Sequence, residues 1–389
     1  MPRILTLAYE YPPPMMGGLG RFNSELYKEI SKLGYDVEIF RTSSAMDGQE
    51  KHAAQGNEIS GLHRSYPIYS LRDVSIYDVQ CVLQSARNPG DLIHAHDWMN
   101  VPPAVLLKLR KIPLVLNFHQ STRGERRTKS EGNLGPKSRI LAKYRIALEA
   151  LGGVLAERVV TVSIRMKNEL VSNYGISPEK ITVVYNGVDL ERFNGNTDRN
   201  RLAGMPQKQR SMLLFVGRIV PSKGIIQLIR SLKIVKKNHS NVFLIVVGTG
   251  PYLRSAQEFA VSLGLEEHVR FVGKVSDSQL PFYYAACDVF VCPSYYEPFG
   301  MTCLEAMASS KPIIVTRNCG ASEIIKTGVH GLIVPSHNSL AMAESIEYLL
   351  SDNEKAIRMG TECRKLAERF SWGEIAKQYD VIYKDILRH

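Results

Sequence analysis

Residues 215–224 read Phe-Val-Gly-Arg-Ile-Val-Pro-Ser-Lys-Gly. This stretch joins the end of a strand-like run to a segment whose apolar residues recur at helical spacing, namely Ile225, Leu228, Ile229 and Leu232. Short runs rich in Ile, Val, Leu and Phe alternate with helix-like segments in the same way along the whole chain. The alternation predicts β-α units that form parallel sheets.

Two such sheets fit the chain better than one barrel, because its 389 residues exceed the ~250–300 at which a single core stops growing. We therefore expect an α/β fold with two Rossmann-like domains, 1–195 and 205–370, joined through polar residues that lack periodicity. An amphipathic helix is expected over 371–389. The expected strands are 4–9, 37–40, 92–94, 114–118, 159–162 and 181–185, then 212–216, 242–247, 269–272, 289–292, 313–316 and 332–334.

The composition is that of an ordinary globular protein, with 44% apolar and 22% charged residues. No apolar run approaches the ~20 residues of a membrane span, and residues 1–4 lead into a strand-like stretch instead of a signal peptide. A cytoplasmic protein is therefore expected. The six cysteines include no Cys-x-x-Cys pair, which favours buried free thiols over a metal site or disulfides.

Part of the net charge of +11 lies in one segment, since residues 121–145 hold eight basic side chains against two acidic ones. Two interpretations stay open. The segment is either a solvated helix and loop or a patch for an acidic partner, such as a phosphorylated acceptor or the inner face of an anionic membrane. Nucleic acid is not expected as a partner, and the sequence leaves the oligomeric state open.

A glycine-containing loop separates the first expected strand from the first helix, with Gly17 and Gly18 near its end. Glycines at such a junction let backbone amides approach an anion at the positive end of a helix. The loop lacks the Gly-x-Gly-x-x-Gly spacing of a dinucleotide fold and contains three prolines. It suits closure over a substrate, and a purely structural loop is the alternative.

Two cations in the 215–224 stretch, Arg218 and Lys223, stand five residues apart. Arginine supplies a planar fork and lysine a point charge, so the pair can flank a diphosphate. A solvated basic loop is the alternative, and the P-loop pattern is absent.

Two carboxylates surround the start of another expected helix near Gly300. Glu297 would lie in the loop before this helix and Glu305 inside it, where the amides of Phe299, Gly300 and Met301 face an anion. Such a pair can accept hydrogen bonds from two parts of a polyhydroxylated ligand. The alternative is a pair of surface acids, but apolar neighbours indicate that Glu305 is partly buried.

Polar residues also follow two strands of the first half. His96 and Asp97 come after one strand and His119 after the next. A metal site on His94, His96 and Asp97 is conceivable but not favoured, because it requires the strand to continue to His96. Polar groups at the carboxyl ends of parallel strands lie where open α/β sheets bind ligands.

Together these motifs resemble the retaining glycosyltransferases of the GT-B type, in particular family 4, which includes sucrose synthases, mannosyltransferases and glycogen-synthase-like enzymes. The resemblance covers nearly the whole chain and implies two Rossmann-like domains that face each other across a cleft, with the C-terminal helix crossing back onto the first domain. The motifs that carry it are 10–13 with 17–18, 186–189, 217–218 with 223–224, 248–251, 297–305 and 330–332.

The resemblance also implies residue roles. Arg218 and Lys223 would hold the donor diphosphate, Glu305 the ribose and Glu297 the transferred sugar. Lys274 and Val275 would lie beside the nucleobase. The other implied donor-binding residues are Gly17, Gly18, Phe299, Gly300 and Met301. On the acceptor side it implies His96, Asp97 and His119, and it places His119 near the reacting sugar. The implied catalytic residues are His119, Glu297, Arg218 and Lys223.

The implied reaction moves a hexose, most simply glucose, from a UDP-, ADP- or GDP-sugar to a carbohydrate acceptor with retention of configuration. No cofactor or metal is expected, because the chain has no Asp-x-Asp motif and the two cations with a helix N-terminus can stabilise the leaving diphosphate. Residues 94–98 resemble glycogen synthases, whereas segment 121–145 favours a lipid-linked acceptor. An NAD(P)-dependent oxidoreductase is the alternative from another class, and Glu38 inside its strand argues against it.

Overall fold

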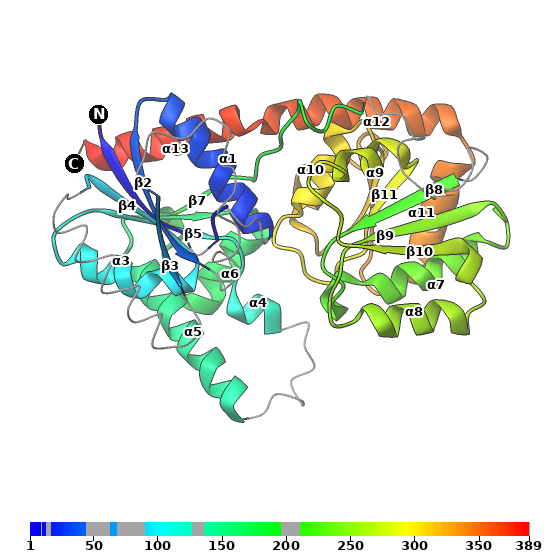
Figure 1. Ribbon diagram of the computed structural model, residues 1–389, viewed down its shortest axis with the longest axis horizontal. Helices are drawn as coiled ribbons and strands as arrows, with labels where there is room; N and C mark the ends of the chain where they lie inside the picture. Colours follow the sequence, from blue (N-terminus) through cyan, green and yellow to red (C-terminus); the bar gives the residue numbers. More distant parts are fainter. Residues whose placement is uncertain are drawn as a thin grey trace. The chain divides into compact units, whose positions relative to one another are not determined.

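The computed structural model describes residues 1–8, 10–12, 17–43, 63–67, 90–126, 136–195 and 211–388. The chain divides into two compact units (Figure 1). Unit 1 comprises Met1–Asn186 together with Trp372–His389, and unit 2 comprises Gly187–Ser371. The domain limits given above remain predictions. The expected linker, residues 195–201 and 206–210, lies outside the described residues except for Gly195.

Unit 1 contains a parallel sheet of seven strands in the order β3-β2-β1-β4-β5-β6-β7. Strand β1, inside the sheet, pairs with β2 on one side and β4 on the other, so that Ile4 lies opposite Val37 and Leu92. The strands are β1 (Arg3–Ala8), β2 (Asp36–Ser43), β3 (His63–Pro67), β4 (Leu92–His96), β5 (Leu114–Phe118), β6 (Arg158–Thr161) and β7 (Ile181–Val183).

Helices connect these strands and cover the sheet (Figure 1). They are α1 (Gly18–Lys32), α3 (Val101–Lys108), α4 (Thr122–Arg126), α5 (Pro136–Leu155), α6 (Ile164–Tyr174) and the C-terminal α13 (Trp372–Leu387). Helix α13 packs against α1 and buries an apolar stripe that includes Ile375, Tyr379 and Tyr383. The last helix of the chain is therefore part of the first unit.

Unit 2 contains a parallel sheet of six strands in the order β10-β9-β8-β11-β12-β13. Numbered from its own first strand this order is 3-2-1-4-5-6, the Rossmann order. The strands are β8 (Ser211–Val216), β9 (Val242–Val247), β10 (Val269–Gly273), β11 (Val289–Cys292), β12 (Ile313–Thr316) and β13 (Gly331–Val334). The helices are α7 (Ile225–Val235), α8 (Leu253–Ser262), α9 (Leu280–Ala286), α10 (Met301–Ala308), α11 (Ser339–Leu350) and α12 (Asn353–Ala367).

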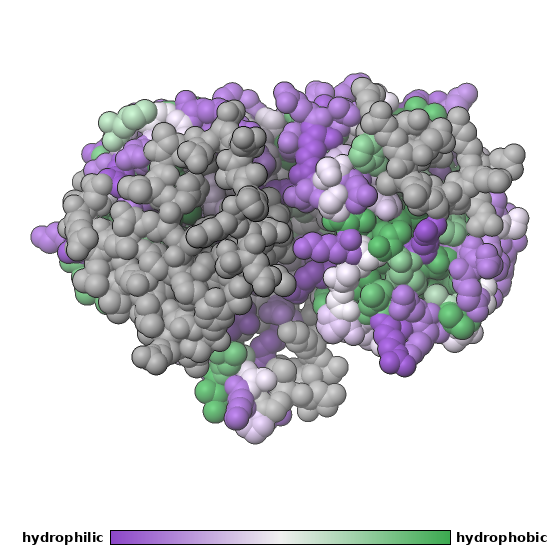
Figure 2. All heavy atoms as spheres, in the orientation of Figure 1, coloured by the Kyte–Doolittle hydropathy of each residue, from purple (hydrophilic) through white to green (hydrophobic). Residues whose placement is uncertain are grey.

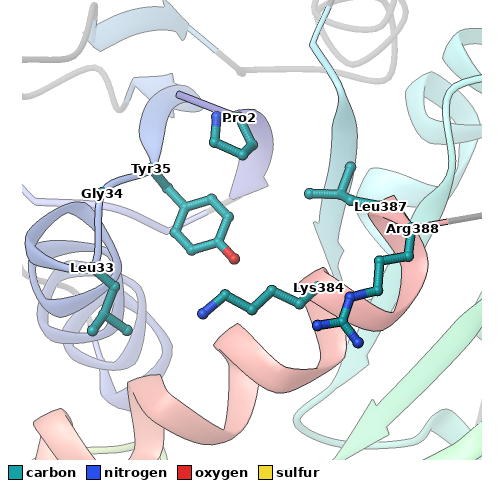
Figure 3. Close-up of a pocket in the computed structure, with 7 residues that line it drawn as sticks. All are labelled: Pro2, Leu33, Gly34, Tyr35, Lys384, Leu387 and Arg388. Carbon is teal, nitrogen blue, oxygen red and sulfur yellow. The ribbon is translucent and has the colours of Figure 1, made fainter.

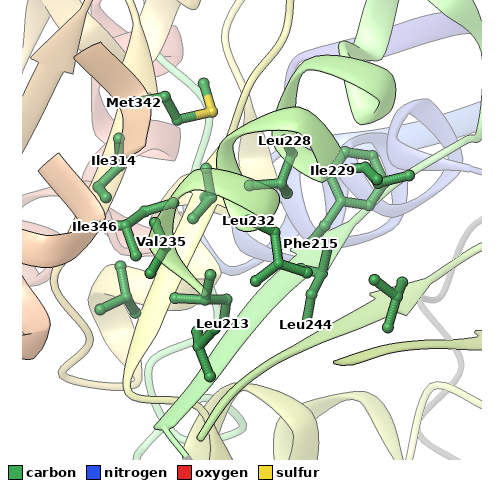
Figure 4. Packing of buried hydrophobic residues seen from close by; sticks show 14 of the residues in the cluster. Leu213, Phe215, Leu228, Ile229, Leu232, Val235, Leu244, Ile314, Met342 and Ile346 are labelled. Carbon is green, nitrogen blue, oxygen red and sulfur yellow. The ribbon is translucent and has the colours of Figure 1, made fainter. Parts of the chain in front are cut away.

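The core of unit 2 lies between this sheet and helices α7 and α11 (Figure 4). Leu228 and Leu232 on α7 are fully buried against Leu213 of β8 and Ile346 of α11. Burying one such side chain stabilises the fold by roughly 1.5–3 kcal/mol, so the apolar stripe recognised in the sequence fixes how α7 lies on the sheet. This packing holds the loop that precedes α7 at the carboxyl edge.

All twelve expected strands are present, so the α/β expectation with two Rossmann-like sheets is confirmed. One strand, β3, was not expected, because its sequence His-Arg-Ser-Tyr-Pro has no apolar run and its proline suits only a sheet edge. The amphipathic helix at the C-terminus is confirmed over Trp372–Leu387. Of the helices in the described residues, none has the length and apolarity needed to cross a bilayer.

Candidate active site

The expected donor-site residues of unit 2 follow the strands at the carboxyl edge of its sheet. Strands β8 and β11 are neighbours although they are not consecutive, so the strand order reverses between them. Open α/β sheets bind ligands at such a switch point. The loop after β8 carries Arg218 and Lys223, and the loop after β11 carries Glu297 and Gly300.

The two loops are packed backbone to backbone. Gly224, which ends the loop after β8, has φ +70°, and a Cβ there would lie 2.0 Å from the carbonyl oxygen of Pro293. The amide of Tyr295 donates a hydrogen bond of 2.8 Å to the carbonyl of Ser222. Only glycine allows this conformation and this approach, which places Lys223 next to the loop after β11.

Lys223 forms an ion pair with Glu297 across the two loops. The pair is mostly shielded from solvent, with exposed side-chain fractions of 22% for Lys223 and 16% for Glu297. Although burial opposes the charge, the carboxylate of Glu297 raises the pKa of Lys223. Arg218 on the same loop is exposed, and its side chain makes no ion pair or hydrogen bond within the described residues. A fixed cation and a free one therefore stand on one loop.

Glu305 lies inside α10 and is 6% exposed, which confirms the expectation that it is buried. Its Oε2 accepts a hydrogen bond of 2.6 Å from the hydroxyl of Tyr284 on α9. Buried carboxylates require such partners. The hydroxyl of Tyr284 therefore fixes the orientation of the Glu305 carboxylate.

The turn that leads into α10 is held by the loop after β12. The amide of Glu297 donates to the carbonyl of Asn318, and the carbonyl of Glu297 accepts from the amide of Gly320. Gly300 caps α10 with φ +103°, a conformation that favours glycine. Phe299 is buried, and Met301 is the first residue of the helix. The first-turn amides of α10 thus follow Glu297 directly.

Lys274 and Val275 follow β10, which is an edge strand two places away from β8. Lys274 is exposed and Val275 is partly buried. The amide of Gly248 after β9 donates to the carbonyl of Gly273, so the loops after β9 and β10 are linked. Lys274 and Val275 thus follow a strand at the same carboxyl edge of the sheet as Lys223 and Glu297.

The residues expected in unit 1 also lie at a reversal of strand order, here between β1 and β4. Gly17 and Gly18 begin α1 and are exposed. A Cβ on Gly17 would lie 3.2 Å from Oε2 of Glu10, so this residue is close to the end of β1. Asp97 follows β4, and its Oδ1 accepts a 2.9 Å hydrogen bond from the amide of His119.

Strand β4 continues to His96, which places His94 and His96 on the same face. Both rings meet one hydroxyl, because Tyr27 Oη lies 2.7 Å from His94 Nδ1 and 2.6 Å from His96 Nε2. His96 Nδ1 lies 3.0 Å from His119 Nε2. A hydrogen-bonded chain therefore runs from α1 through β4 to His119.

A second branch reaches His119 from the C-terminal helix. The Tyr379 hydroxyl of α13 donates to Asn117 Oδ1, and Asn117 Nδ2 lies 3.0 Å from His119 Nε2. His119 is partly exposed, whereas His94 and His96 are fully buried. The network thus orients the ring at the carboxyl end of β5.

Burial keeps these rings neutral. It lowers the pKa of His94 and of His119 to about 3 and lowers that of His96 well below its usual range. Burial raises the pKa of Asp97 to about 7, with a smaller contribution from the nearby Glu149 carboxylate. Unit 1 thus presents neutral hydrogen-bonding groups beside an acid that titrates near neutral pH.

The histidines do not converge on a metal position, since Tyr27 occupies the space between His94 and His96. Within the described ranges, the group of three or more ligand-type side chains with atoms within 4.8 Å of one another is Cys292, Cys303 and Cys319. The five described cysteines are free and buried, as expected.

Several partners of the site residues were not expected from the sequence. They are Tyr27, Asn117, Tyr284 and Tyr379. The three tyrosines lie on helices whose apolar pattern resembles that of core residues, whereas Asn117 is a polar residue inside the apolar strand β5. The acid that a dinucleotide ribose would need, Glu38, is buried within β2 and pairs with Arg3 at 2.7 Å.

A separate hollow of about 230 Å³ lies at the opposite edge of the sheet of unit 1 (Figure 3). Its lining includes Pro2 before β1, Tyr35 before β2, and Lys384 and Arg388 at the end of α13. This is the amino edge of the strands. Because ligands of open α/β sheets bind at the carboxyl edge, the hollow is not part of the candidate site.

Known proteins resemble both halves of the chain. Residues 197–366 match the family model "Glycosyl transferases group 1", and residues 16–192 match "Glycosyltransferase Family 4". The D-inositol 3-phosphate glycosyltransferase of Corynebacterium glutamicum is 31% identical over 391 residues, covering 95% of this chain and 92% of its own. The glycogen synthase of Mycobacterium tuberculosis is 25% identical over 406 residues, covering 98% of this chain and 94% of its own.

A solved structure shares the fold. The Anabaena protein HepE in complex with UDP-glucose has a TM-score of 0.77 at 21% identity, covering 98% of this chain and 99% of its own. This likeness agrees with the two Rossmann-like sheets described above.

Proposed function

Because this chain belongs to the group 1 glycosyltransferases of the family 4 type, we propose that it transfers a hexosyl group from a nucleoside-diphosphate sugar to a carbohydrate acceptor. The observation that carries the proposal is the position of Lys223 and Glu297, which meet at the switch point of unit 2 beside the start of α10. The solved relative HepE binds UDP-glucose, which supports a nucleotide-sugar donor.

In this proposal, the loop after β8 neutralises the leaving nucleoside diphosphate. As the glycosidic bond to the donor breaks, negative charge grows on the diphosphate, and fixed cations stabilise it. Lys223 is already positioned by Glu297, and exposed Arg218 adds a planar fork. The amides of Phe299, Gly300 and Met301 would contribute the positive end of α10. No metal is required in this scheme.

The other donor contacts follow from the same arrangement. Glu305, oriented by Tyr284, would accept hydrogen bonds from the ribose, and Lys274 and Val275 would lie along the nucleobase. Glu297 would accept from hydroxyls of the transferred sugar. In unit 1, we propose that Gly17 and Gly18 contact donor oxygens, while His119, together with His96 and Asp97, holds the reacting sugar or the acceptor.

The acceptor that the charge pattern favours is anionic, because segment 121–145 carries eight basic residues against two acidic ones. A relative that acts on D-inositol 3-phosphate is consistent with a phosphorylated acceptor. The M. tuberculosis glycogen synthase supports an α-glucan as the competing acceptor. We propose glucose as the transferred hexose and retention of its anomeric configuration.

Equilibrium binding of UDP, ADP and GDP to the intact chain tests the donor assignment. One diphosphate is expected to bind at least tenfold more tightly than the corresponding monophosphate, because the cations act on the terminal phosphate. Equal affinities for monophosphate and diphosphate would contradict a diphosphate site. The preferred base would identify the donor class.

A second candidate function has its own observation. Helix α5 exposes large apolar side chains among basic ones, with Ile140 69% and Tyr144 51% exposed beside exposed Lys137 and Lys143 (Figure 2). A helix with this mixture suits the surface of an anionic membrane. The acceptor would then be lipid-linked.

Co-sedimentation with anionic vesicles separates this function from the first. We expect salt-sensitive binding that is lost in the double variant Ile140→Asn/Tyr144→Asn and kept in the control variant Val381→Asn on α13. This result would support a lipid-linked acceptor. Val381 is a suitable control because it is a similarly exposed apolar residue, 67% accessible. Absence of vesicle binding would contradict the second function.

A further inference from the structure

Three cysteines from three different segments converge beside the candidate donor site. Cys292 ends β11, Cys303 lies in α10, and Cys319 follows β12. Their exposed fractions are 5%, 0% and 0%. The Sγ atoms of Cys292 and Cys319 are 3.8 Å apart, those of Cys303 and Cys319 are 3.9 Å apart, and all three lie within 4.8 Å of one another.

The two measured separations, which also suit thiol–thiol hydrogen bonds, match those that a common metal ion imposes. With a metal–sulfur bond of about 2.3 Å, two thiolates of a tetrahedral ion are ~3.8 Å apart and two of a trigonal ion ~4.0 Å apart. The cluster could therefore close on one ion with little backbone movement. Cys319 Sγ also donates to the carbonyl of Phe299 at 3.2 Å, and this hydrogen bond would be given up when the thiol loses its proton.

The surroundings also suit negative charge. Beside the larger effect of Glu297, negative charge on Cys292 and Cys319 would raise the pKa of Lys223. Ser294 Oγ lies 3.5 Å from Cys292 Sγ. Three thiolates around a divalent ion carry one net negative charge, which the ammonium of Lys223 would balance.

We propose that Cys292, Cys303 and Cys319 form a binding site for one thiophilic cation of the Zn²⁺ class, adjoining the donor site. On binding, each thiol releases its proton to solvent and its sulfur forms one bond to the ion, so that no oxidant is needed. Thiolates select soft ions of this kind over Mg²⁺ or Ca²⁺. The site does not depend on the proposed transferase activity.

The cluster touches the turn that carries Glu297. A Cβ on Gly300 would lie 3.0 Å from Cys319 Sγ and 3.2 Å from Cys303 Sγ, so this turn rests directly on the sulfurs. The two residues that hold the backbone of Glu297, Asn318 and Gly320, flank Cys319 in sequence. If the donor assignment is correct, a bound ion will hold this turn in place, and the ammonium of Lys223 will balance the negative charge of the metal–thiolate cluster. Less of its charge is then available to the diphosphate, so donor affinity will fall.

Titration of the reduced full-length protein with Cd²⁺, followed by the ultraviolet cadmium–thiolate band, tests the site. The variant Cys81→Ser/Cys287→Ser/Cys363→Ser keeps only the cluster, and we expect it to bind one equivalent as the unsubstituted protein does. Adding Cys303→Ala to this variant is expected to weaken binding by at least ~100-fold, since it removes a ligand and not merely a supporting group. Zn²⁺ in excess is expected to compete with Cd²⁺ for the cluster, which binds the softer Cd²⁺ more tightly.

Two outcomes would overturn the proposal. One is the absence of a thiolate band in the variant that keeps only the cluster, and the other is unchanged affinity after Cys303→Ala. Thermal unfolding with and without Zn²⁺ provides a measurement that does not depend on the buried substitution. A bound ion raises the unfolding temperature of the variant that keeps the cluster. No rise at saturating Zn²⁺ would also contradict the site.

Discussion

Lys223 on the loop after β8 pairs with Glu297 on the loop after β11, at the point where the strand order of unit 2 reverses. Lys223 is the residue proposed to bind the diphosphate, and Glu297 is the residue proposed to bind the transferred sugar. Gly224 makes the contact possible, because any Cβ there would collide with the Pro293 carbonyl. An arriving diphosphate would share the ammonium with Glu297, while exposed Arg218 is free to turn toward it.

Replacement of Lys223 tests the diphosphate assignment. In Lys223→Ala, the affinity for the preferred nucleoside diphosphate should fall about 10- to 100-fold, as expected for loss of a hydrogen bond to a charged group. Calorimetric titration measures this, with Lys236→Ala on the surface of unit 2 as the matched control. Wild-type affinity in Lys223→Ala would remove Lys223 from the donor site.

Glu305→Gln tests the ribose assignment. The variant should bind the nucleoside diphosphate about tenfold more weakly but bind inorganic pyrophosphate as the wild type does, since only the nucleotide carries a ribose. Competition binding with both ligands gives the comparison. Tyr284→Phe, which removes the hydroxyl that orients Glu305, should show a smaller effect of the same kind. An equal loss for pyrophosphate would instead indicate a structural role for Glu305.

Tyr27→Phe tests whether the buried network positions His119. The change removes the hydroxyl that contacts both His94 and His96. Turnover should fall by about tenfold while the dissociation constant of the donor stays within about twofold, because Tyr27 itself does not face the donor. Tyr35→Phe, which loses a hydrogen bond to Asp380, is the control in the same unit. A parallel loss in both variants would point to general destabilisation.

Acid should destabilise the protein through buried His94 and partly exposed His119. Their folded pKa values lie below the unfolded value of about 6.5, so the unfolded chain binds more protons and stability falls as pH drops below 6.5. At pH 5, His94 and His119 should each cost about 2 kcal/mol of unfolding free energy.

Asp97 acts in the opposite direction. Its folded pKa of about 7 exceeds the unfolded value, so its contribution to stability declines as pH rises from about 4 to 7. Denaturant titrations between pH 5 and 8 give the slope of the unfolding free energy against pH. Below about pH 6.5, His94→Gln should reduce this slope by the amount that corresponds to about one bound proton. An unchanged slope in that variant would show that folding does not lower the pKa of His94.

Local patterns were sufficient to predict most of the fold. Each expected strand is a compact apolar run, and the stripe on α7 determined which face it buries. Strand β3 escaped detection because pairing with β2 at the sheet edge, and not an apolar run, defines it. The pairing partner lies elsewhere in the chain, so no window of sequence contains the signal.

For the candidate site, the sequence predicted the residues that lie in recognisable motifs but not the contacts that support them. Glycines and charged residues next to strand ends identified Lys223, Glu297 and Glu305. The supporting contacts arise from the tertiary fold. Tyr379 meets Asn117 across 262 positions of sequence, and Tyr27 meets His94 across 67. Both tyrosines occupy apolar helix faces, where the sequence pattern of a core residue and that of a hydrogen-bond partner are identical.

The most direct test is a turnover measurement with a panel of UDP-, ADP- and GDP-sugars, with and without glycogen or an inositol phosphate as acceptor. Release of the nucleoside diphosphate and the anomeric proton signal of the product are followed together by NMR. We expect one donor to be consumed, faster with one acceptor, with retained configuration, and with at least tenfold slower release in Lys223→Ala. Folded protein that consumes none of these donors, or equal rates in the wild type and Lys223→Ala, would contradict the account.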